Sequence, residues 1–133
     1  MDHDGLGFVP DEVVDGATVF VLGQNPGADE EREGKPFVGA TGETMARDFF
    51  PRAGLTRGVN VSLGNVLRCR WVSDGQRTNL LPRGAVLRQA VAQCRQYFTL
   101  PTTTKLVVAC GALAWSALEK PGSISAWRGF VHE

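Results

Sequence analysis

Three short stretches of this 133-residue sequence combine groups that could bind or transform a small polar ligand. The first is Gly23–Gly27 (GQNPG), in which two glycines and a proline favour a rigid turn with exposed backbone N–H groups. Gln24 and Asn25 add amides to this turn; an amide takes up no proton at neutral pH, but its oxygen can hold a water molecule. The same composition is also typical of a plain turn.

The second stretch is Gly34–Gly42 (GKPFVGATG), and its notable residue is Phe37. An aromatic ring held in a loop between proline and glycine could stack on a nucleobase, an interaction worth about 1–3 kcal/mol. It could equally fill the core beneath the loop, as most aromatic side chains do. The sequence leaves both interpretations open.

The third stretch is Gly64–Arg70 (GNVLRCR), where Asn65 offers a hydrogen-bond donor and an acceptor side by side. Uracil presents the complementary pair at O4 and N3–H, whereas cytosine presents the reverse pattern and would leave buried groups unpaired. The alternative is a turn residue that bonds its own backbone.

All three stretches must be positioned by a sheet. Short apolar runs predict parallel strands over Ala17–Gly23, Val59–Leu63 and Lys105–Cys110. The first is apolar on both faces and is expected in the middle, whereas the second alternates. Ligands of such sheets bind beyond the carboxyl ends of the strands, where the first and third stretches lie. We therefore expect Gln24, Asn25, Phe37 and Asn65 to line one concave pocket.

The connections between these strands complete an α/β alternation. We expect a loop over Gln24–Ala40, a helix capped by Thr41 that runs through Phe50, and a loop over Arg68–Gly84. Two further helices are predicted over Ala85–Phe98 and Gly111–Leu118, followed by a hairpin or a fourth strand in Ser123–Glu133. The length fits one domain over residues 1–133.

Charge and composition restrict the function classes. The net charge is zero, but residues 1–48 carry 11 acidic and 3 basic groups, and residues 49–133 carry 3 and 11. The basic half is either a solvated polar face or a surface for DNA phosphates; the arginines expected to face DNA are Arg68, Arg70, Arg77 and Arg83.

No apolar run is long enough to cross a membrane, and three cysteines favour a reducing compartment over a disulfide framework.

The order of the three stretches resembles the iron–sulfur, family-four uracil-DNA glycosylases, from about Gly5 to Gly129. The resemblance implies a three-layer αβα fold with a short, mostly parallel sheet. It implies that Gln24 and Asn25 position the attacking water, that Phe37 stacks on uracil, and that Asn65 reads the edge of the base. The partner it implies is uracil-containing DNA, and we expect a cytoplasmic monomer of a bacterium, an archaeon or a phage-infected cell.

The sequence departs from this family at three points. Cys69 and Cys94 match two of the four cysteines that bind the cluster in this family, but residues 1–16 contain no cysteine and Cys110 is expected in the core. We therefore expect no iron–sulfur cluster and no other cofactor. The C-terminal strand and its histidine loop are expected to be missing, which would make the domain C-terminally truncated. Gln24 and Asn25 also stand where the family usually has Glu-Ala, so the water-positioning carboxylate is absent.

Three functions remain open at this stage. The first is a DNA repair glycosylase that flips uracil out and hydrolyses its N-glycosidic bond. The second is a non-catalytic uracil- or DNA-binding relative that has lost the catalytic histidine loop. The third is an unrelated α/β nucleotide-binding enzyme, which is disfavoured because neither GxGxxG nor GxxxxGKS occurs.

Overall fold

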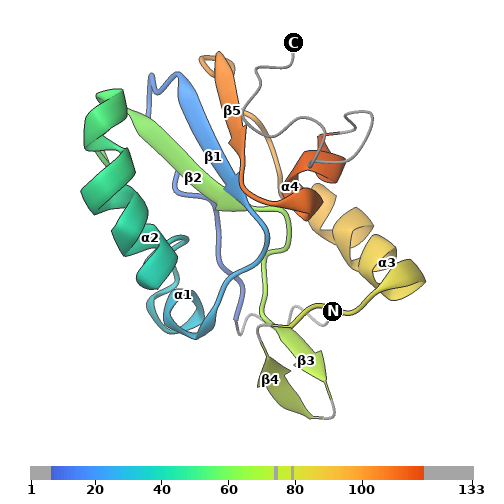
Figure 1. The fold of residues 1–133 in the computed structure, drawn as a ribbon. Helices are drawn as coiled ribbons and strands as arrows, with labels where there is room; N and C mark the ends of the chain where they lie inside the picture. Colours follow the sequence, from blue (N-terminus) through green and yellow to red (C-terminus); the bar gives the residue numbers. More distant parts are fainter. Residues whose placement is uncertain (1–6, 74, 79, 119–133) are drawn as a thin grey trace.

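The strand predicted over Ala17–Gly23 lies in the middle of the sheet, as expected. The computed structural model describes residues 7–73, 75–78 and 80–118. In it β1 (Val19–Gly23) pairs in parallel with β2 (Val61–Asn65) on one side and with β5 (Leu106–Ala109) on the other. The order β2-β1-β5 and the parallel orientation confirm the predicted sheet (Figure 1).

The central strand is buried because its side chains enter a core on each face. Val21 packs with Val61, Leu63 and other apolar side chains on one face, while Phe20 and Leu22 pack on the other. Helices cover both faces, with α1 and α2 on one side and α3 and α4 on the other (Figure 1). This is the three-layer α/β arrangement that the sequence predicts.

Strand β2 differs from the prediction in its bounds and in its burial. It was expected over Val59–Leu63 as an alternating strand, but it runs to Asn65 and all five residues are buried. An N-terminal segment covers its outer edge: Glu12 and Leu63 exchange both backbone hydrogen bonds, at 2.8 and 3.0 Å. The Val14 N–H donates to the hydroxyl oxygen of Ser62 at 3.0 Å. The Ser62 side chain is therefore paired inside the protein, not exposed to water.

The segment between β1 and β2 contains more helix than predicted. Helix α1 (Ala28–Glu33) lies within the expected loop, and α2 (Ala40–Thr44) has Gly39, not Thr41, at its N-cap. The chain continues as a π-helix, η1 (Met45–Phe49), and a 3-10 turn, η2 (Pro51–Ala53). Acidic residues in the first turn of α1 favour this helix, because they interact well with its N-terminal dipole.

The second half of the chain adds a hairpin and two helices. Strands β3 (Trp71–Ser73) and β4 (Gln76–Thr78) form an antiparallel pair inside the expected loop. Helices α3 (Gly84–Arg95) and α4 (Ala112–Ala117) agree with the predicted segments to within three residues at each end. The segment Ser123–Glu133, expected to form a hairpin or a fourth strand, lies outside the described residues.

Strand β5 forms an edge of the sheet as far as the structure is described. Its pairing there is with β1 alone, and Leu106 and Val108 are 46% and 39% exposed. Across the ranges 7–73, 75–78 and 80–118, no helix has both the length and the apolar character needed to cross a bilayer.

Candidate functional site

The carboxyl ends of β1 and β2 bring together two residues that lie 28 positions apart in the sequence, Phe37 and Asn65. Gly23 ends β1 directly beside Asn65 of β2. A Cβ atom placed on Gly23 would lie 2.5 Å from Asn65 Oδ1 and 2.6 Å from Phe37 Cζ. The amide and the tip of the ring therefore converge on one point above this glycine. Any larger residue at position 23 would collide with both.

Asn65 keeps its amide available in this arrangement. The residue is only 6% exposed, yet no residue within the described part of the chain hydrogen-bonds its side chain. Its side-chain oxygen and nitrogen are not among the fully buried atoms that lack a partner, so water or a ligand can reach them. The alternative of a turn residue bonded to its own backbone therefore has no support among the described contacts.

Phe37 is a core residue and a site residue at the same time. It is 8% exposed and packs against Val21, Phe50 and Leu63, while the tip of its ring reaches Gly23. Its backbone has φ 54°, the left-handed region, which costs a non-glycine residue about 1–3 kcal/mol and persists only where neighbours enforce it. The two interpretations left open by the sequence are thus compatible.

Two features enforce the backbone of Phe37. The guanidinium of Arg57 donates from its two terminal nitrogens to the carbonyl oxygens of Pro36 and Phe37. The same guanidinium donates to both carboxylate oxygens of Glu12, at 3.0 and 3.4 Å. Gly42 lets α2 lie close to the Phe37 carbonyl, because a Cβ atom at position 42 would be 1.9 Å from that carbonyl oxygen.

Gln24 and Asn25 lie next to this point in the chain, but their side chains make local contacts. The Gln24 amide donates to Asn25 Oδ1 at 3.4 Å, and the Asn25 amide donates to the Pro26 carbonyl at 3.3 Å. Gln24 is exposed and Asn25 is half-buried. The turn itself is anchored to the end of β2, because the Val66 and Leu67 N–H groups donate to the Gly23 and Gln24 carbonyls, both at 3.0 Å.

One of the arginines expected to face DNA is in the interior. Arg68 is 1% exposed and forms an ion pair with Asp11 through both terminal nitrogens. It also donates to the Tyr97 carbonyl at 3.2 Å and lies 6.0 Å from the centre of the Phe98 ring. Burial raises the pKa of the Asp11 carboxyl despite the stabilising Arg68. Arg68 is therefore a structural residue, and its assignment to DNA is wrong.

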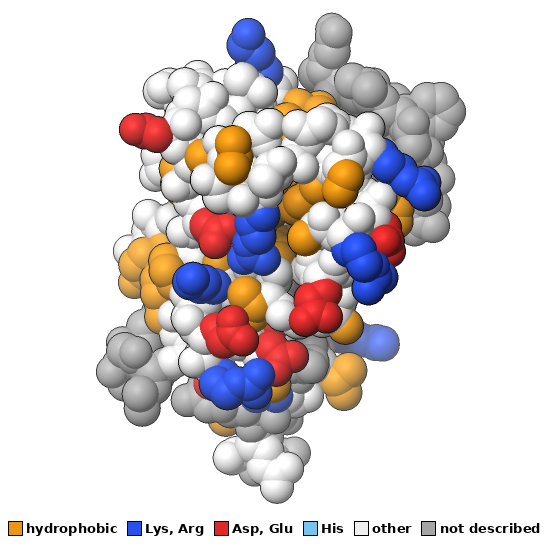
Figure 2. Space-filling model, turned by 90° about the vertical axis from the view of Figure 1, so that its left-hand side faces the viewer, with side chains coloured by type: hydrophobic (Ala, Val, Ile, Leu, Met, Phe, Trp, Pro, Cys, Tyr) orange, Lys and Arg blue, Asp and Glu red, His pale blue; other side chains and the backbone are white. Residues whose placement is uncertain are grey.

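The other three arginines differ in their surroundings. Arg70 forms an ion pair with Glu31 at 3.1 Å, and both side chains are less than one-fifth exposed. Arg83 is exposed at the N-terminal end of α3, and the side chain of Arg77 lies outside the described part of the structure. On the side of the molecule that carries α1 and α2, acidic and basic side chains are interspersed without a continuous basic field (Figure 2).

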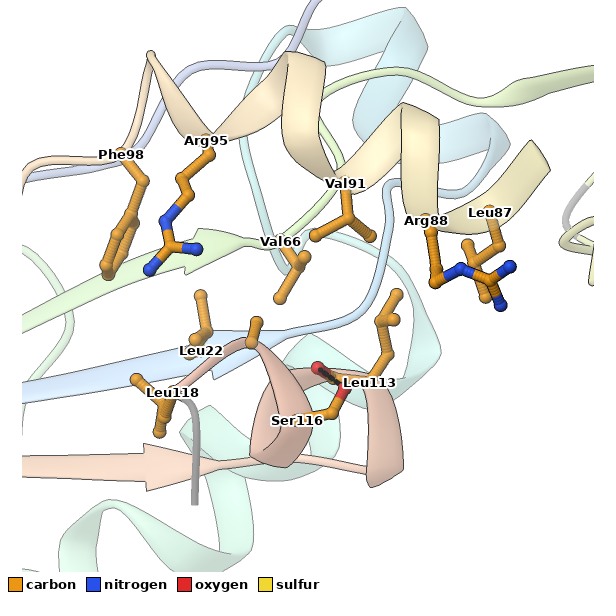
Figure 3. Close-up of a pocket in the computed structure, with 11 residues that line it drawn as sticks. Leu22, Val66, Leu87, Arg88, Val91, Arg95, Phe98, Leu113, Ser116 and Leu118 are labelled. Atoms are coloured by element: carbon orange, nitrogen blue, oxygen red, sulfur yellow. Dashed lines mark hydrogen bonds between the residues drawn. The ribbon is translucent and has the colours of Figure 1, made fainter. Parts of the chain in front are cut away.

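Two cavities of about 610 and 620 Å³ are lined by residues other than Phe37 and Asn65. In the first, Leu22 and Val66 point into a space between α3 and α4, and Arg95 approaches it beside Phe98 (Figure 3). The second is lined mainly by apolar residues of α2, η1 and β5. The four residues expected to line one pocket line neither of these cavities.

Nearly the whole chain matches a known protein family. A family model described as the uracil DNA glycosylase superfamily matches residues 10–131, which is nearly the whole chain. The chain belongs to this superfamily. The match includes β1, β2 and β5 together with the loop that carries Phe37.

Individual relatives in the superfamily match over shorter segments. The type-4 uracil-DNA glycosylase of Pyrobaculum aerophilum is 42% identical over 52 residues, which is 39% of this chain and 26% of that protein. Those of Sulfurisphaera tokodaii and Saccharolobus solfataricus are each 39% identical over 62 residues, 47% of this chain and 28% of each relative. The matching segments thus span less than a third of the length of these relatives.

The cysteines do not fit the four-thiolate cluster that the family resemblance implies. The sequence holds three cysteines. Cys69 and Cys94 are buried, and Cys94 packs with Leu67 and Ala90, whereas Cys110 packs against the core on the opposite face of the sheet. Burial raises the pKa of the Cys94 and Cys110 thiols, which favours the protonated form over the thiolate that binds iron. Among the described residues, no three His, Cys, Asp or Glu side chains are grouped closely enough to hold a metal ion. We therefore assign no step to a cluster.

Sequence reasoning missed several residues that shape the site. Arg57 and Glu12 make their contacts across 20 to 45 residues of chain, so no local pattern reveals them. Gly23 and Gly42 were visible as glycines within two of the stretches, but only the structure shows that each makes room for Phe37 or Asn65.

Proposed function

We propose that the protein is a uracil-DNA glycosylase that accepts uracil flipped out of DNA and hydrolyses its N-glycosidic bond. The observation that carries the proposal is the convergence above Gly23 of the Phe37 ring and the Asn65 amide, which has no hydrogen bond to another described residue. Membership of the superfamily supports it, and so do the type-4 uracil-DNA glycosylases that match part of the chain. The proposal includes action as a monomer in the cytoplasm.

The proposed roles follow the chemistry of each side chain. The base would stack on Phe37, and Asn65 would donate to O4 and accept from N3–H. Cytosine presents the opposite pattern, so it would leave the buried amide unpaired. Extrusion of a base costs a few kcal/mol, which these contacts must recover.

Bond cleavage would then depend on charge and water at the end of β1. As the sugar–base bond lengthens, positive charge develops on the sugar and negative charge on uracil, which Asn65 stabilises by its donated hydrogen bond. A water molecule held by Asn25 Oδ1, with Gln24 beside it, would add to the sugar carbon that uracil leaves, and the proton that it loses would neutralise the uracil anion. Asn25 cannot act as a general base, so its contribution is to orient the water and not to take its proton.

The DNA strand would be bound by the arginines that remain candidates after the burial of Arg68. These are Arg70, Arg77 and Arg83, which flank β3, β4 and the start of α3. Arg83 is the exposed member of the group with a described side chain. Its contact with phosphate would add about 0.7–0.9 to the slope of log affinity against log salt.

A specific observation also favours the second candidate function, a uracil- or DNA-binding protein without catalysis. The Asn25 amide donates to the adjacent Pro26 carbonyl at 3.3 Å, and Gln24 stands where the resemblance described above has the water-positioning glutamate. A binder would keep Phe37 and Asn65 while lacking cleavage.

The experiment that separates these functions measures both binding and abasic-site formation. Oligonucleotides with one uracil, single- and double-stranded, are incubated with the wild-type chain, Asn65→Asp and the control Asn60→Asp. Asn60 lies in a turn where its amide bonds Thr56 and Gly54, away from Gly23. We expect Asn65→Asp to weaken uracil binding by about 1–3 kcal/mol and to improve the fit of cytosine, because a carboxylate can accept from its amino group.

Each outcome selects one interpretation. Cleavage by the wild type that falls in Asn65→Asp but not in Asn60→Asp supports the glycosylase. Binding that falls in Asn65→Asp without any wild-type cleavage supports the non-catalytic binder. Uracil affinity that is unchanged by Asn65→Asp excludes a uracil site at this position.

A further inference from the structure

Arg57 connects three parts of the chain behind the candidate site. It lies in the turn before β2, and its guanidinium contacts the carbonyls of Pro36 and Phe37 and the carboxylate of Glu12. Glu12 belongs to the segment that pairs with the outer edge of β2. The side chains of Arg57 and Glu12 are 24% and 26% exposed, so their interaction is partly shielded from water.

These contacts use properties that arginine alone among the cationic residues has. Its planar guanidinium presents donors in fixed directions, so one side can bind a carboxylate in bidentate fashion while other N–H groups reach two successive carbonyls. A lysine ammonium is a point charge with three donors on a flexible stem, and it cannot reproduce this set of contacts.

The carbonyls that Arg57 binds are those on either side of the Phe37 Cα atom, one from the preceding peptide and one its own. Holding both fixes the orientation of the two peptide planes that define the left-handed conformation of Phe37. That conformation directs the ring toward Gly23 and Asn65, where its Cζ atom and the Asn65 Oδ1 atom approach the same point.

We infer that Arg57, anchored by Glu12, is a positioning residue that sets the place of the Phe37 ring beside Asn65. Its role in catalysis rests on the proposed function, but its control of the ring does not. Arg57 contacts no reacting atom: it acts through Phe37, and the effect of changing it depends on the presence of that ring.

The test uses the full chain and five variants. Arg57→Lys keeps the charge but loses the planar set of donors, and Glu12→Gln keeps Arg57 but removes the charge of its anchor. Arg47→Lys is the matched control, because Arg47 pairs with Asp48 on the surface with 70% of its side chain exposed. Phe37→Ala, alone and combined with Arg57→Lys, completes a double-mutant cycle.

Two readouts are measured. The first is ¹⁹F NMR of protein labelled with fluorophenylalanine, in which the resonance missing from Phe37→Ala identifies Phe37 among the seven phenylalanines. The second is kcat/KM on single-stranded DNA that contains uracil, with melting temperatures measured in parallel. The NMR readout does not depend on any enzymatic activity.

We expect the Phe37 resonance to shift or broaden in Arg57→Lys and, more weakly, in Glu12→Gln, and to stay in place in Arg47→Lys. We expect kcat/KM to fall up to about a hundredfold in Arg57→Lys, the scale of a 1 Å misplacement in an active site. In the Phe37→Ala background the same substitution should cost little further activity, whereas a loss through general destabilisation would be equal in both backgrounds. If Arg57→Lys does not fold, Glu12→Gln provides the same comparison.

The inference and the proposed function fail in different ways. An unchanged Phe37 resonance in Arg57→Lys and Glu12→Gln overturns the inference, whatever the activity. Equal loss of kcat/KM with and without Phe37 also overturns it. A wild-type chain that neither binds nor cleaves uracil overturns the proposed function, while a displaced Phe37 resonance in the Arg57 variant would still support the positioning role.

Discussion

Replacing Gly23 with alanine should separate the loss of function from the loss of stability. The added Cβ would lie 2.6 Å from Phe37 Cζ and 2.5 Å from Asn65 Oδ1. Two carbon atoms attract each other best at about 3.5–4.0 Å, so the ring must retreat by roughly 1 Å. The backbone of Gly23 is held in place by its pairing with Asn65 and by the hydrogen bond that its carbonyl accepts from the Val66 N–H.

The expected loss of stability in Gly23→Ala is small compared with the expected loss of catalytic rate. Overpacking of this kind costs about 1–3 kcal/mol, while a domain is stable by about 5–15 kcal/mol, so most of the protein stays folded. A shift of 1 Å at the site can cost about a hundredfold in rate. We therefore expect kcat/KM on uracil-containing DNA to fall about a hundredfold, with a much smaller change in the folded fraction.

The matched control is Gly39→Ala. The atoms nearest to a Cβ there would be carboxylate oxygens of Glu30 and Asp29, at 3.2 and 3.4 Å, which can rotate away. Activity is followed by cleavage of the abasic product, and stability by urea unfolding of each variant. Full activity in Gly23→Ala at unchanged stability would refute the reasoning, because the ring and the amide would then not need the positions in which they converge.

Four further expectations can be tested with the same protein. Asn25→Ala should slow cleavage and leave uracil affinity nearly unchanged, because Asn25 is assigned to the water; a parallel loss of affinity in binding titrations would contradict this assignment. Asp11→Ala should lower the free energy of unfolding by about 3–5 kcal/mol in urea titrations, because it leaves the buried Arg68 charge unpaired, whereas replacing both residues with apolar ones should restore most of the loss. Arg83→Ala should reduce the salt dependence of DNA binding by about 0.7–0.9 in the log–log slope, and an unchanged slope would remove Arg83 from the DNA-binding surface. Iron analysis and the visible absorbance of purified protein should show no four-iron cluster, and four iron atoms per chain would require ligands other than the three cysteines.

The parallel sheet could be predicted because its signals are local. The apolar run of β1 and the glycine that ends it specify a buried central strand, and the two flanking runs specify its neighbours. The boundaries of β2 were two residues too early, since Val59 is 64% exposed and Asn65 is inside the strand. Helix α1 was missed because the prolines and glycines around it favour a loop.

The burial of Arg68 could not be predicted, because it depends on a partner far away in the chain. Arg68 lies among other arginines, which suggested a basic surface, but Asp11 pairs with it across 57 residues. Phe37 and Asn65 approach each other because β1 and β2 end side by side and the loop that carries Phe37 follows β1; their roles in binding a base stay predictions. The roles given to Gln24, Asn25, Arg70, Arg77 and Arg83 remain predictions.

The pairing of residues 11 and 12 with Arg68 and Arg57 has a consequence for the order of folding. These contacts close loops of 57 and 45 residues, and such long-range closures carry a high entropic cost and are slow to form. The loop of Phe37 therefore cannot reach its final conformation as an independent unit, even though its own residues are contiguous. We expect its backbone amides to exchange with solvent at the rate of global unfolding, unlike those of an ordinary surface loop. The site would then exist only in molecules that have folded completely, and partially folded chains would have no means of holding a base.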